Sequence, residues 1–147
     1  DVAQRFPGRA RRDGRFYVRD FTLAEIRRLT VHERCNADGS PVYGRRFASD
    51  GEDFKVMTFA EELEFIQTLI AVHGREVGIY PEIKRPAWHR QQGVDITPQF
   101  LRVLADFGYE EHHDPVYLQC FDAAELRRIR HNLGCRLKLI QLIGENS

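Results

Sequence analysis

The stretch VYLQCFDAAELRRIRHNLGCRLKLIQLI, residues 116–143, decides the fold. Its opening residues, Val116–Phe121, form an apolar run that predicts a strand. Asp122 and Glu125 follow with the spacing of a helix-capping box, and Gly134 marks the end of that helix before a second apolar run. Because a connection of this length crosses over a sheet, the pattern predicts two parallel strands joined by a helix.

The same alternation extends towards the N-terminus. A third strand is predicted at Val77–Lys84, followed by a helix with Thr97 as its N-cap and Gly108 as its end. A long amphipathic helix is expected to begin after Thr58. Helix–strand repeats therefore occupy residues 54–143, and the fold class is α/β with parallel strands.

The first third of the chain reads differently. Thr22 and Glu25 form a capping box that predicts a short helix to about Leu29. Residues 30–53 are rich in Asn, Asp, Gly, Ser and Pro, which indicates a loop-rich insertion outside the sheet. The basic cluster Arg9–Arg12 suits a solvated loop or helix start, or else a phosphate-binding patch; the absence of interleaved aromatic residues or a glycine-rich loop argues against the patch.

Composition excludes several classes of function. The 22 basic and 22 acidic side chains balance, so no overall field attracts the chain to nucleic acid or to an anionic membrane. No apolar run approaches the roughly 18 residues that a membrane span needs. Three cysteines without CxxC spacing argue against a disulfide framework and a zinc site, and Cys120 reads as a small core residue.

The strand at Val77–Lys84 carries charge where a parallel strand should be apolar. Alternation places Tyr80, Glu82 and Lys84 on one face and isoleucines on the other. In a closed barrel the charged face looks inward, and the C-terminal mouth holds the chemistry. A carboxylate suits a hard cation and an ammonium suits a phosphate oxygen, so the pair could hold a metal and its phosphate; a structural ion pair is the alternative.

Other polar residues are candidates by position. Gln119 should face the same way as Glu82 and could bind a polar ligand, although a satisfied core amide explains it equally well; Gln141 has the same two interpretations. His89 follows the charged strand on a predicted loop over the mouth, where it could contact substrate or simply be an exposed histidine. The sequence His112–Asp114 precedes a strand and is expected to be a solvated turn.

Four ordered blocks of sequence resemble one family, and together they cover essentially the whole chain. The blocks are FPGRARRDGRFYVRDFTLAEIRRL, FKVMTFAEELEFIQ, GIYPEIKRPAWHRQQGVDI and VYLQCFDAAELRRI. They are similar to the middle of a bacterial glycerophosphodiester phosphodiesterase of the periplasmic type.

The resemblance implies a partial TIM (β/α)8 barrel and the hydrolysis of glycerophosphodiesters to glycerol 3-phosphate and an alcohol. It implies a divalent cation, Ca²⁺ first and Mg²⁺ second, held by three carboxylates. Glu82 matches the third of these carboxylates, and Lys84 matches the lysine near the substrate phosphate. The resemblance strengthens the interpretation of Glu82 as a metal ligand.

Other motifs of the family do not occur in this sequence. They are an HRG motif with a catalytic histidine, a Glu-x-Asp metal pair and an HD motif with a second histidine that the family carries shortly before the first block. A barrel needs about 250 residues, so the chain, which opens on Asp1, is expected to be a fragment that is inactive alone. One carboxylate cannot satisfy Ca²⁺, which takes about six to eight oxygen ligands.

Further expectations concern the surroundings of the site. The family's architecture would place residues 30–53 near the barrel mouth, and the resemblance implies a periplasmic location, with a cytoplasmic one as the alternative. Uncovered sheet edges would favour self-association. Two rival functions are another phosphate-handling barrel enzyme of the aldolase or isomerase type and a non-catalytic half-barrel that binds a partner.

Overall fold

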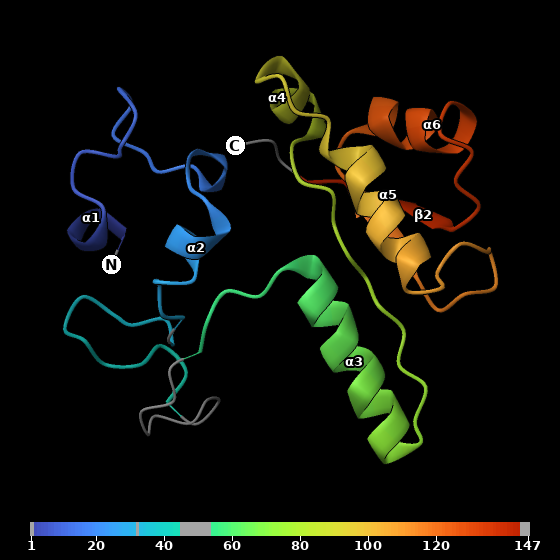
Figure 1. The fold of residues 1–147 in the computed structure, drawn as a ribbon, viewed down its shortest axis with the longest axis horizontal. Helices are drawn as coiled ribbons and strands as arrows, with labels where there is room; N and C mark the ends of the chain where they lie inside the picture. The colour runs from blue at the N-terminus through green and yellow to red at the C-terminus, as the bar shows by residue number, and fades with distance from the viewer. Residues whose placement is uncertain (1, 32, 45–53, 145–147) are drawn as a thin grey trace. The chain divides into compact units, whose positions relative to one another are not determined.

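The computed structural model describes residues 2–31, 33–44 and 54–144. The chain divides into two compact units, residues 1–58 and 59–147, and each is described by itself. Figure 1 shows the elements of both units.

The described residues of the first unit form three short helices, and the capping box predicted at Thr22 and Glu25 is confirmed. They are α1 (Val2–Arg5), the 3₁₀ helix η1 (Val18–Asp20) and α2 (Leu23–Ile26). The Glu25 backbone N–H donates to Thr22 Oγ1 at 3.2 Å, and the Thr22 N–H donates back to Glu25 Oε2 at 2.8 Å. The helix ends at Ile26 rather than near Leu29, because the following residues form a turn closed by the Leu29 N–H to the Ile26 carbonyl.

The basic cluster Arg9–Arg12 lies in a loop, as predicted, and two of its arginines have acidic partners. Arg9 pairs with Glu25 at 2.7 Å, and Arg11 pairs with Asp20 at 2.6 Å. These ion pairs already use the charge that a phosphate-binding patch would need. The hydrogen bonds from Arg9 and from Thr22 lower the pKa of Glu25 to about 2.

The described part of the loop-rich insertion contains no helix and only isolated bridges. Val31 pairs antiparallel with Phe54, and Cys35 pairs antiparallel with Pro41 around a turn. Gly39 in that turn has a φ of 83°, a conformation that glycine adopts without a steric penalty. The part of the prediction that concerns residues 45–53 lies outside the described residues.

The second unit is a parallel sheet with helices. Its helices are α3 (Phe59–His73), α4 (Pro86–Gln91), α5 (Ile96–Asp106) and α6 (Ala123–His131), and its strands are β1 (Tyr117–Cys120) and β2 (Lys138–Gln141). The two strands are parallel, with Tyr117 opposite Lys138, and α6 connects them. The strand–helix–strand unit predicted from residues 116–143 is confirmed.

The predicted strand at Val77–Lys84 is interrupted, and the prediction of a continuous strand is wrong. It pairs with β1 through two isolated parallel bridges, Ile79 with Val116 and Glu82 with Gln119. Four backbone hydrogen bonds join the two segments: Ile79 N to Pro115 O, Tyr117 N to Ile79 O, Gln119 N to Pro81 O and Ile83 N to Gln119 O, at 2.8–3.0 Å. Pro81 has no N–H to donate to the Tyr117 carbonyl, so one rung of the ladder is missing.

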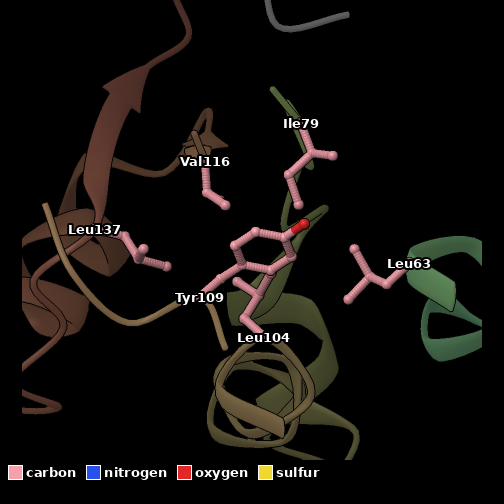
Figure 2. Close-up of a cluster of buried hydrophobic side chains, with 6 residues drawn as sticks. All are labelled: Leu63, Ile79, Leu104, Tyr109, Val116 and Leu137. Carbon is pink, nitrogen blue, oxygen red and sulfur yellow. The ribbon is translucent and has the colours of Figure 1, made fainter. Parts of the chain in front are cut away.

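One face of this sheet is buried under helices. Figure 2 shows one of its two apolar clusters, in which the Tyr109 ring lies among side chains from α3, α5 and the sheet. The members of that cluster are Leu63, Ile79, Leu104, Tyr109, Val116 and Leu137. The second cluster contains Ile83, Leu118, Cys120, Leu126 and Ile129. Cys120 is fully buried, as predicted, and the burial raises the pKa of its thiol.

The predicted start of α5 is wrong and the predicted capping box of α6 is incomplete, because tertiary partners engage the side chains of Thr97 and Glu125. The N-cap of α5 is Asp95, and Thr97 lies inside the first turn, where its hydroxyl donates to Glu125 at 2.6 Å. Asp122 does cap α6 by accepting from the Ala124 N–H at 2.9 Å. Glu125 does not complete a capping box, because its carboxylate is buried against other helices.

Candidate functional site

The second face of the sheet, here called the polar face, carries the predicted site residues Glu82, Lys84 and Gln119. It consists of Tyr80, Glu82 and Lys84 from the interrupted strand, Tyr117 and Gln119 from β1, and Lys138 and Ile140 from β2. Tyr80 remains 52 % exposed and Tyr117 41 % exposed. The described residues therefore leave this face largely open.

Glu82 and Gln119 are neighbours on the polar face, as the alternation predicts. The parallel bridge places them opposite one another, and backbone bonds on both sides of Glu82 fix the register. The Gln119 side-chain amide donates to the Tyr80 carbonyl at 2.9 Å. The amide nitrogen therefore has a structural role, as the interpretation of a satisfied amide predicts. The amide oxygen remains a candidate to bind a ligand.

The carboxylate of Glu82 has one oxygen that no described residue satisfies. Glu82 Oε1 is shielded from solvent and has no hydrogen-bond partner among the described residues. A buried carboxylate oxygen without a donor or a cation is costly, so a partner for it is expected. A hard divalent cation, which prefers oxygen ligands, fits this atom.

The rest of a metal site is not found in the part of the chain that the structure describes. No group of three or more His, Cys, Asp or Glu side chains comes together there. Ca²⁺ takes about six to eight oxygen ligands, so Glu82 fits as one ligand and further ligands must come from elsewhere.

Lys84 lies at the end of the interrupted strand, on the same face as Glu82 by alternation, and is exposed. The next residue, Arg85, has a φ of 50° and a ψ of 49°, a left-handed conformation that is rare for residues other than glycine. This conformation turns the chain directly from the strand into α4, with Pro86 buried at its first turn. A single sharp turn at Arg85 thus separates the interrupted strand from α4.

His89 lies on α4 and not on a loop, so this part of the prediction is wrong. The physical reason is the turn at Arg85, after which Pro86 has the φ that suits the start of a helix. His89 is half-buried, and its ring meets that of Trp88 edge-on, with centroids 4.8 Å apart. Its proposed contact with substrate stays a prediction.

The remaining polar candidates are explained by local structure. Gln141 shares its row with Cys120, not with Glu82, and its amide donates to the Phe121 carbonyl at 2.9 Å. Asp114 closes a turn by accepting from the N–H groups of Glu110 and Glu111 at 2.7 Å, which lowers its pKa. The solvated turn predicted around Asp114 is confirmed.

A buried polar cluster behind the sheet was missed by the sequence reasoning. Glu125 is fully buried and accepts hydrogen bonds from Arg90, Thr97 and Arg128. Arg128 also pairs with Asp95, which lowers the pKa of Asp95. The only signal was that Glu125 lies four residues before Ile129, on the apolar stripe of its helix.

Comparisons with known proteins identify the family. The sequence profile described as the glycerophosphoryl diester phosphodiesterase family matches residues 1–147. The chain belongs to this family. A glycerophosphodiester phosphodiesterase of Haemophilus influenzae is 49 % identical to it and one of Treponema pallidum 43 %, both over 98 % of this chain. One from Arabidopsis thaliana is 31 % identical over 76 % of the chain and 30 % of its own length.

The fold of the family fits the parallel strands and helices of the second unit. The family has a TIM-barrel-like fold and generally depends on a divalent metal, and the parallel strands and helices of the second unit are compatible with part of such a barrel. The chain spans 42 % of the length of the Haemophilus and Treponema relatives. No helix among the described residues has the length and apolarity to cross a membrane.

Proposed function

We propose that this chain forms part of the active site of an enzyme that hydrolyses glycerophosphodiesters to glycerol 3-phosphate and an alcohol. The names of the Haemophilus and Treponema relatives support the reaction. The observation that carries the proposal is the buried Glu82 oxygen on the polar face, which no described residue satisfies. Lys84 is the next residue along the strand on the same face. The partial sheet would then be a segment of a (β/α)8 barrel with the polar face inside.

Each residue of the site has a separate task. Glu82 would be one ligand of a divalent cation, Ca²⁺ in preference to Mg²⁺, which when bound would counter the charge of the phosphate. Lys84 would place an ammonium group near a phosphate oxygen and stabilise the negative charge that grows there. Gln119 would hold the backbone at Tyr80 and offer its amide oxygen to the substrate. Histidine acid–base groups would come from segments outside this sequence.

The first experiment replaces the matching segment of the Haemophilus relative with residues 1–147. Release of glycerol 3-phosphate from glycerophosphocholine is then measured at several Ca²⁺ concentrations. Glu82→Gln and Lys84→Met should each lower turnover by about 100-fold, the size of effect seen when one group that stabilises transition-state charge is lost. Added Ca²⁺ should partly restore Glu82→Gln, because that change weakens cation binding, but not Lys84→Met.

The matched control is Glu111→Gln, which removes a carboxylate from a surface pair with Arg136. It should leave turnover unchanged. Wild-type activity of the Glu82→Gln chimera would refute the assignment of Glu82. The 147-residue chain alone is expected to show no turnover, and substantial activity there would show that a complete site lies within it.

Two further parts of the proposal need different measurements. A periplasmic location is supported by the resemblance to the periplasmic-type enzymes, and fractionation of cells that express the natural protein tests it. Self-association of the isolated chain through its open sheet edges is tested by sedimentation, since unpaired edges are sites of strand addition. A monomer at all concentrations would contradict it.

A further inference from the structure

The short helix α4 has an ion pair to the rest of the second unit, from Arg90 to Glu125. It has six residues, of which only Pro86 is buried. Neither of the two apolar clusters of the unit contains an α4 residue among the described side chains. A helix this short has little stability of its own, so its position must be held by tertiary contacts.

Arg90 supplies such a contact from the last turn of α4. Its guanidinium donates to Oε2 of Glu125, which lies 35 residues further along the chain on α6 and is fully buried. The other carboxylate oxygen of Glu125 accepts from the Thr97 hydroxyl at 2.6 Å and from Arg128 at 2.8 Å. One buried carboxylate therefore connects α4, α5 and α6.

The geometry points to Arg90 and Glu125 as positioning residues that lock α4 and, through it, the Lys84–Arg85 turn at the end of the sheet. This inference rests on the proposed function for its consequence, because α4 begins two residues after Lys84. The left-handed Arg85 between them is a sharp, sparsely populated conformation that persists only when both sides are held. If α4 is no longer held, the C-terminal side of Arg85 is released.

The contact between Arg90 and Glu125 does not use the planar, two-donor geometry of a guanidinium. Only one nitrogen of the Arg90 guanidinium, Nη1, makes the bond to Glu125. A lysine at position 90 offers one charged donor as well, so Arg90→Lys should retain much of the lock, whereas Arg90→Met removes it. The burial of Glu125 makes the contact costly to lose, because its oxygen has no access to water.

The chain contains its own reporter of α4. Trp88 is its single tryptophan and lies on α4, two residues before Arg90. Fluorescence of the 147-residue chain therefore reports on this helix alone and does not depend on enzymatic activity. Far-UV circular dichroism and the melting temperature report on the whole fold.

The experiment compares Arg90→Met, Arg90→Lys and the control Arg136→Met in the 147-residue chain. Arg136 also forms an ion pair, with Glu111, but it lies outside α4 and the buried cluster. Arg90→Met should shift Trp88 emission to longer wavelength and raise its quenching by acrylamide, Arg90→Lys should restore most of the wild-type signal, and Arg136→Met should change neither.

Emission of Arg90→Met equal to that of the wild type would overturn the proposal, and so would an equal shift in Arg136→Met. If Arg90→Met fails to fold, the Arg90→Lys variant decides: an intact fold with wild-type Trp88 emission supports the lock, and an intact fold with a fully exposed Trp88 refutes it.

The consequence for the site is measured in the chimera. Arg90→Met should reduce kcat/KM by up to about 100-fold, the cost of a misplacement of about 1 Å, and Arg90→Lys should retain most of the wild-type activity. If Trp88 responds as expected while wild-type and variant chimeras are both inactive, the lock stands and the proposed function fails. If the chimera is active and Trp88 does not respond, the lock fails alone.

Discussion

The two units of the chain differ in what holds them together. In the second unit, two apolar clusters under a parallel sheet contain most of the fully buried side chains. In the first unit, Phe6 and Ile26 are the buried apolar residues among those described, and partly exposed ion pairs and a capping box organise the rest. The comparison teaches that one chain can combine a unit stabilised by apolar burial with one stabilised by contacts that water and salt weaken.

The largest expected effect comes from the core of the second unit. Leu104→Ala should lower the free energy of unfolding by about 3 to 4 kcal/mol, because Leu104 is fully buried and its loss leaves a cavity. Urea denaturation measures it. Leu69→Ala on the exposed side of α3 is the matched control and should cost much less. Equal losses in the two variants would show that the cluster in Figure 2 is not the core.

The buried charge should rank second. Glu125→Ala should cost about 2 to 3 kcal/mol, because it leaves the Arg90 and Arg128 guanidiniums without their shared acceptor. Both arginines are about a third exposed, so water relieves part of the penalty. Urea denaturation again gives the value, with Glu111→Ala as the control. A neutral Glu125→Ala would mean that the cluster contributes no net stability.

The capping box offers a smaller test in the first unit. Thr22→Ala should cost about 1 kcal/mol, since it removes the side-chain acceptor of the Glu25 N–H. Hydrogen exchange, followed by mass spectrometry of peptides, should show faster exchange in α2 and unchanged exchange in α5. Thr22→Ser keeps the hydroxyl and should behave as the wild type. Faster exchange throughout the chain would break the distinction between the units.

Acidification should give the smallest effect on stability. It also distinguishes the two units, because Glu25 lies in the first one. Glu25 has a pKa of about 2 in the folded chain, lowered first by the Arg9 hydrogen bond, against about 4.3 in an unfolded chain. Its contribution to stability is present above the unfolded pKa and is lost as the pH falls from about 4.5 through about 2. The protection of α2 amides, measured as their exchange rate relative to that of an unfolded chain at the same pH, should fall over this range, and Glu25→Gln should flatten that dependence. An unchanged pH profile in the variant would contradict the role of the pair.

Local signals in the sequence predicted local structure well. Thr22 and Glu25 form the box that their spacing predicts, and the strand–helix–strand unit around α6 follows from alternation and the Gly134 stop. The facing of Glu82 and Gln119 was also predictable, because side chains alternate along a strand and parallel neighbours share a face.

Contacts between distant residues could not be predicted. Asp122–Glu125 has the same capping-box spacing as Thr22–Glu25, yet Glu125 bonds to Arg90, a residue that only the fold brings near. The Thr97 hydroxyl was drawn to the same carboxylate, so α5 begins at a different residue. For the candidate site, Glu82 was identified from its type and position, but its unsatisfied oxygen is visible only in three dimensions.

The alternation of side chains along the interrupted strand also makes substitutions and single-residue deletions differ in their effect on this segment. A substitution at Pro81 alters one backbone bond and leaves every side chain on its own face. Deletion of one residue between Ile79 and Lys84 would instead reverse the facing of all that follow, so that isoleucine would enter the polar face and charge would be forced beneath the helices. A point mutation therefore leaves the remaining side chains of this segment on their own faces, while any change in its length by one codon should be eliminated by selection.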